Sequence, residues 1–162
     1  MIKTLSTAIT AVLLTFSPTC ARIEGGTGDL LRLVESYGVD VQSSSTRCKP
    51  GVDGMFVHKP PAIHICHDGR PDKSDHDTVR HEVWHYLQSC VTPNGARMLR
   101  PYFDRPAYVA LIDSALTRQQ QARIMHSYHE RFAATELEAF AAAENLTADM
   151  IAYYIRKSCT PV

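Results

Sequence analysis

The residues of this chain best suited to chemistry are His81, Glu82 and His85, within the stretch HEVWH. If this stretch is helical, the two histidines lie one turn apart and project from the same face. Two imidazoles placed in this way can bind one Zn²⁺, and Glu82 beside them can act as a general base. The alternative interpretation is an amphipathic helix in which both histidines are only partly buried polar residues.

The surrounding sequence favours a helix for HEVWH. Ser74 with Asp77 three residues later resembles a capping box, and no Gly or Pro follows as far as Ser89. A strand would also place His81 and His85 on one face, but about 13 Å apart, which is too far to share a metal. We therefore predict a helix that begins near Ser74 and continues to about Ser89.

A catalytic zinc needs three protein ligands and an open position for water. The segment TELEAFAAAE, about fifty residues after HEVWH, offers Glu136 and Glu138. Residues two positions apart on a helix face nearly opposite ways, so only one of these carboxylates can reach the metal. His126 and His129 are rival donors for the third position.

The two motifs together resemble the gluzincin zinc metallopeptidases, in which HExxH supplies two histidines and a later helix supplies a glutamate. In the integral-membrane and periplasmic branch of that group the later motif is E-x-x-A-D. Alignment on Ala139 makes Glu136 the residue that corresponds to its ligand. Phe140 stands where the motif has an aspartate that supports a ligand histidine by hydrogen bonding, and this departure keeps Glu138 as the alternative.

The resemblance implies a zinc metalloendopeptidase with a minimal zincin-like domain. On this reading His81, His85 and Glu136 hold one Zn²⁺ per chain, and the metal lowers the pKa of a bound water towards about 7. Glu82 accepts the proton of this water and passes it to the leaving amine of a peptide or protein substrate. The alternatives are a catalytically inactive zinc-binding or interaction domain of the same fold, and a structural domain in which HEVWH is accidental.

Two further parts of such a site are expected. By analogy with zincins, the strand at Ala62–Cys66 would be an edge strand that pairs with an extended substrate. The oxyanion of the tetrahedral intermediate also needs a hydrogen-bond donor. The candidates for this donor are Tyr128, His129, Tyr153 and Tyr154.

The first 21 residues have the anatomy of a secretory signal peptide. Lys3 precedes an apolar run from Leu5 to Phe16, and small residues allow cleavage after Ala21. The run is too short for a membrane span, so we expect a mature domain at residues 22–162 that is secreted or periplasmic and free of the membrane. A weaker alternative is a lipoprotein acylated at Cys20.

The cysteines support export. Removal of Cys20 leaves four, and an even number in an exported domain predicts two disulfides. We favour Cys48–Cys66, which flanks a candidate hairpin, and Cys90–Cys159, which ties the chain end to the HEVWH helix. Free buried thiols are the alternative, and the absence of a CxxC spacing argues against a cysteine zinc site.

Length and composition predict one domain of the α+β class. The 162 residues suit one compact domain, and 17 Lys and Arg balance 17 Asp and Glu, so no overall field favours nucleic acid. We expect a monomer with a zincin-like fold, in which a small antiparallel sheet precedes the HEVWH helix and a mostly helical C-terminal half. The other predicted elements are a helix capped by Thr27, strands at Val39–Val41, Met55–His58 and Ala62–Cys66, and helices at Ala107–Leu116, from Thr117 through Phe132, at Ala133–Asn145 and after a Thr147 cap.

Overall fold

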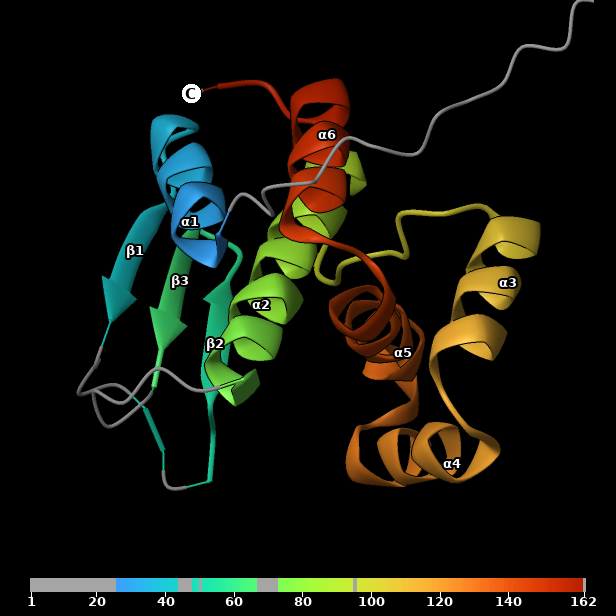
Figure 1. Ribbon diagram of the computed structural model, residues 1–162. Helices are drawn as coiled ribbons and strands as arrows, with labels where there is room; N and C mark the ends of the chain where they lie inside the picture. The colour runs from blue at the N-terminus through green and yellow to red at the C-terminus, as the bar shows by residue number, and fades with distance from the viewer. Residues whose placement is uncertain (1–25, 44–47, 50, 67–72, 95, 162) are drawn as a thin grey trace, which may run out of the picture.

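The computed structural model of the protein describes residues 26–43, 48–49, 51–66, 73–94 and 96–161 (Figure 1). The predicted signal peptide and Cys20 lie outside these residues. Within them the fold is mixed α+β, with a small sheet and a mostly helical C-terminal half, as the sequence predicts. The elements in chain order are α1 (Thr27–Ser36), β1 (Asp40–Ser43), β2 (Gly54–Val57), β3 (Ala62–Ile65), α2 (Lys73–Val91), α3 (Arg105–Ala115), α4 (Arg118–Ser127), α5 (Glu130–Asn145) and α6 (Ala148–Ser158).

The sheet has three strands in the order β1-β3-β2, and two predictions about it are wrong. β2 and β3 form the expected antiparallel hairpin, but β1 pairs with β3 in parallel, so the sheet is mixed. β3 is therefore the central strand, and the edge strand next to α2 is β2. Because β2 takes one side of β3, β1 can pair only with the other side, and a short alternating sequence carries no signal for its direction.

Helix α2 lies between the sheet and the C-terminal helices, where it packs against β2, α5 and α6 (Figure 1). All residues from His81 to Gln88 are buried, and Val83, Trp84 and Leu87 are completely inaccessible to solvent. Between His81 and Gln88 the helix therefore has no solvated face for its polar side chains. Each buried polar group on it therefore needs a partner within the protein.

The helix ends follow local capping chemistry with some corrections. Thr117 and Gln120 form the predicted capping box of α4, and Thr147 caps α6. The helix expected to include Phe132 stops at Ser127, and α5 begins at Glu130. The other corrections are that Gly26 rather than Thr27 precedes α1, that α2 begins at Lys73 rather than after Ser74, and that Asp104 caps α3.

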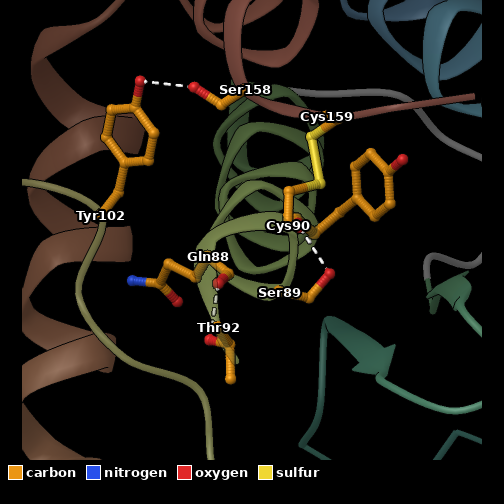
Figure 2. Close-up of a disulfide and its surroundings, with 8 residues drawn as sticks. Gln88, Ser89, Cys90, Thr92, Tyr102, Ser158 and Cys159 are labelled. Atoms are coloured by element: carbon orange, nitrogen blue, oxygen red, sulfur yellow. Dashed lines mark hydrogen bonds between the residues drawn. A yellow bond between two sulfur atoms is a disulfide. The ribbon is translucent and has the colours of Figure 1, made fainter. Parts of the chain in front are cut away.

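Two disulfides join Cys48 to Cys66 and Cys90 to Cys159, which is the pairing that the sequence favours. The second links the C-terminal ends of α2 and α6, and beside it the hydroxyls of Tyr102 and Ser158 lie 2.9 Å apart (Figure 2). Two such pairs point to an oxidising compartment. None of the helices in the described part of the chain has the length and apolar character needed to cross a membrane.

The two disulfides should stabilise the protein unequally, because they close loops with sequence separations of 18 and 69 residues. Loop-closure entropy predicts a loss of about 4 kcal/mol for the double variant Cys90→Ala/Cys159→Ala and about 3 kcal/mol for Cys48→Ala/Cys66→Ala. Urea unfolding without reductant measures both losses relative to the oxidised wild type. Equal or absent losses would contradict the prediction.

Candidate metal centre

Three side chains from two helices converge beside α2. His81 and His85 come from α2 and Glu136 from α5. The two Nε2 atoms of the histidines lie 3.0 Å apart, and the Glu136 oxygens lie 3.3 Å from Nε2 of His81 and 3.5 Å from Nε2 of His85. Donors at the corners of a tetrahedron around Zn²⁺, each about 2.05 Å from the metal, are about 3.3 Å apart. Glu136 faces His81 with Oε2 and His85 with Oε1, so its carboxylate lies close to both rings. The three groups are therefore near enough to share one small cation.

The chemistry of the donor set is compatible with a bound cation. Two imidazole nitrogens and a carboxylate are all electron-rich, and atoms of this kind approach so closely only around a proton or a metal ion. Burial would raise the pKa of Glu136, but its contacts with His81 and His85 overcome this and lower the value to about 2. A carboxylate thus stays ionised in the interior, where a divalent cation would neutralise it.

Glu138, the alternative third ligand, points away from this group and is committed elsewhere. Its side chain is completely buried, and both carboxylate oxygens accept hydrogen bonds at 2.8 to 3.0 Å. The donors are Trp84 Nε1, Gln88 Nε2 and the backbone amides of Tyr102 and Phe103. The rival histidines also lie elsewhere: His126 is exposed on α4, and His129 caps α5 by accepting the backbone amide of Arg131.

Gln88 fixes the tautomer of neutral His85. The Gln88 amide nitrogen donates to Thr135 O at 3.0 Å and to Glu138 Oε2 at 2.8 Å. Its oxygen therefore faces His85 Nδ1, at 2.7 Å, and an amide oxygen can only accept. The proton of the neutral imidazole must lie on Nδ1, which leaves the Nε2 lone pair free for a metal. Sequence reasoning missed Gln88, although a Gln one turn after a ligand histidine on a buried helix was a usable signal.

His81 is held by packing. The ring of Phe140 meets it edge to face, with centroids 4.4 Å apart. Its Nδ1 is buried and has no hydrogen-bond partner among the described residues. Phe140 thus supports the ligand by contact where the resembled motif has an aspartate, and burial lowers the pKa of His81.

Glu82 lies next to the three donors and is only 6 % exposed. Burial raises its pKa to about 7, and nearby Glu136 adds to the rise, while His85 and the backbone of Phe56 act in the opposite sense. A carboxyl group with such a pKa can both accept and donate a proton near neutral pH. Glycine at position 54 of β2 lets the Thr78 and Glu82 side chains of α2 pack against the strand, because a Cβ there would lie 2.6 Å from Thr78 and 2.8 Å from Glu82.

Two hollows open on either side of the donors. The first, about 380 Å³, is lined by residues that include Gly54, His81, Glu82, Tyr128 and Phe140. The second, about 240 Å³, is lined by residues that include Phe56, His85, Phe132 and Glu136. β2 borders both, so the strand placed to pair with a ligand is β2 and not Ala62–Cys66, which is correctly assigned as a strand but lies at the sheet centre.

Of the predicted oxyanion donors, only Tyr128 reaches a hollow. Burial, with smaller effects from Glu136 and Glu82, raises its pKa to about 12, so its hydroxyl stays protonated. Tyr153 is 58 % exposed, and Tyr154 packs against Trp84. His129 is the cap of α5.

Comparison with known protein families, curated proteins and solved structures found no match to this chain. Its function must therefore be inferred from the group itself. His81, His85 and Glu136 could hold a metal ion.

Substitution of Glu136 and of Glu138 on α5 should have different effects, one on metal affinity and the other on stability. Glu136→Gln should weaken zinc binding by at least about 100-fold and leave the metal-free fold intact, because Glu136 only completes the donor set. Glu138→Gln should cost about 3 kcal/mol of stability, because it introduces a donor where four donors already point. Competition with a chromophoric chelator and urea unfolding of the metal-free proteins measure these effects. The assignment is wrong if Glu138→Gln alone loses the metal.

Gln88→Leu should weaken zinc binding by about 10- to 100-fold, because His85 loses the acceptor that holds its tautomer and orientation. Long-range proton–nitrogen NMR should place the proton of His85 on Nδ1 in the wild type and show a tautomer mixture in the variant. Gln121→Leu is the matched control. The Gln121 side chain also donates to a backbone carbonyl, that of Leu116 at 3.0 Å, but it lies on α4 and not beside the metal group. Equal zinc affinity in both variants would contradict this role.

Proposed function

We propose that the protein is a zinc-dependent metallopeptidase with a zincin-like fold, exported from the cell, in which His81, His85 and Glu136 hold the metal. The proposal depends above all on the close approach of these three donor groups beside Glu82. Two nitrogens and one carboxylate suit zinc better than magnesium or calcium, which prefer oxygen ligands. Three protein ligands also leave a fourth position for water or substrate.

A zinc ion bound there would supply Lewis acidity to a water and to the scissile carbonyl. Glu82 is placed to accept a proton from that water as the new C–O bond forms, and to return it to the amine nitrogen as the C–N bond breaks. The Tyr128 hydroxyl, kept protonated, can donate to the oxygen of the tetrahedral intermediate. Gln88 meanwhile holds His85 in the tautomer that binds the metal.

The two hollows support cleavage within a chain. β2 is an edge strand, and in the described residues no other strand pairs with its outer side. An extended peptide added along β2 would enter one hollow, cross the metal group and leave through the other. A groove open on both sides accepts chain on both sides of the scissile bond, which favours an endopeptidase.

Glu82→Gln tests the catalytic half of the proposal. The variant should keep one zinc per chain, because Glu82 is outside the donor set, and should lose at least about 100-fold in the hydrolysis of a reduced, unfolded protein. Elemental analysis and fluorescent-substrate cleavage give the two readouts, and Glu35→Gln is the control, because Glu35 is an exposed glutamate on α1 that lines neither hollow. Unchanged hydrolysis would mean that Glu82 is not the base. A wild type that binds zinc and cleaves nothing would leave a metal-binding domain without turnover.

A further inference from the structure

The two hollows beside the metal group differ in charge. Besides Glu82, the first is lined by Asp53, Asp77 and Glu144, and no Lys or Arg is among the described residues of its lining. The second is lined by Arg97 and His58, and among the described residues of its lining the only acid is Glu136 of the metal group.

In the first hollow two carboxylates are available to a ligand. Asp77 is paired with Arg80, one turn along α2. Asp53 and Glu144 are exposed and have no ion-pair partner within the described residues. They come from different walls, since Asp53 directly precedes β2 and Glu144 lies on α5. A cationic side chain entering between these walls would meet negative charge on both sides.

The second hollow is mostly apolar. Phe56, Phe132, Met98 and Leu99 provide hydrocarbon surface there, and the guanidinium of Arg131 lies 4.6 Å from the centre of the Phe132 ring. Burial and the neighbouring Lys59 lower the pKa of His58, so this side chain is uncharged at neutral pH. The fixed positive charge of Arg97 would repel a cation and tolerate an apolar or acidic group.

We propose that the groove selects peptides carrying a basic residue for the first hollow and a large apolar residue for the second, on opposite sides of the bond held at the metal group. This inference rests on the proposed function, because it takes the groove to be a peptide site. It commits to Asp53 and Glu144 as the residues that determine specificity. Each exposed charge pair is worth up to about fivefold in affinity, so two acting together should give a preference of about tenfold or more.

The test measures binding separately from turnover. Zinc-loaded Glu82→Gln protein, as the full mature chain, is titrated with fluorescein-labelled peptides in which Arg and Phe flank a central Ala-Ala, in both orders. Matched peptides carry Glu in place of Arg, or Gly in place of Phe. In one of the two orders the Arg/Phe peptide should bind about tenfold more tightly than the Glu/Phe peptide, and this difference should shrink with added salt.

Charge reversal then locates the preference. Glu144→Lys and Asp53→Lys, each made in the Glu82→Gln background, should reduce the Arg-over-Glu preference about five- to tenfold and leave the Phe-over-Gly preference unchanged. Glu35→Lys is the matched control, since Glu35 is also an exposed helical glutamate but lies on α1 and lines neither hollow. The control should bind like the parent protein.

Three outcomes would overturn the inference: no peptide bound by zinc-loaded protein, no preference for Arg, or a preference that survives both reversals. Failure of the proposed function has a different signature. If the wild type hydrolyses none of these peptides while the preference and its loss on reversal persist, the groove recognises basic peptides without cleaving them, and the inference stands as a statement about binding.

Discussion

The buried carboxylate of Glu138 is the interaction on which the geometry of the metal group depends. Enclosing a charge in the interior costs several kcal/mol unless donors surround it, and Glu138 accepts four hydrogen bonds. Two donors come from α2 and two from the backbone ahead of α3, so one carboxylate joins three segments. Helix α5, which carries Glu138, presents Glu136 on its other side. The distance from Glu136 to the two histidines is therefore set by a residue that never touches the metal position.

The two histidines are supported by different physics. His85 is oriented by a hydrogen-bond chain that passes through Gln88 to Glu138, whereas His81 is confined by the Phe140 ring. The motif that this segment resembles has an aspartate four residues after its glutamate. Here Phe140 takes that position, so no carboxylate is available there. His85 is held instead by the Gln88 amide and, through it, by the Glu138 carboxylate, and both side chains are completely buried. His81 is thus held by contact with a ring, and His85 is held by a hydrogen bond that fixes its tautomer.

What could be predicted from the sequence is what local chemistry determines. Helix α2 follows from an uninterrupted stretch between turn signals, and the Thr117 and Thr147 caps follow from short-range hydrogen bonding. Helical periodicity shows that only one α5 glutamate can join the histidines, and the preference for Glu136 comes from the resemblance to a known motif. The parallel pairing of β1 could not be predicted, because alternation marks faces and not strand direction. Nor could the partners of Glu138, since two of them are backbone amides 35 and 36 residues away, and a backbone amide carries no signature in the sequence.

The Cys48–Cys66 bond encloses the segment that carries Gly51, Asp53 and Gly54, which form one wall of the first hollow. The three metal donors come from α2 and α5, outside that covalent loop. Metal capture and the fixing of this wall are therefore separate events with separate chemical requirements. A reduced chain would keep the three donors in place and would lose the covalent link across this wall, so that hydrogen bonds such as that from Cys66 N to Asp53 O, at 2.8 Å, would hold the wall alone. If the groove binds peptides as we propose, its affinity for them would thus depend on the redox state of the compartment, even at constant metal supply.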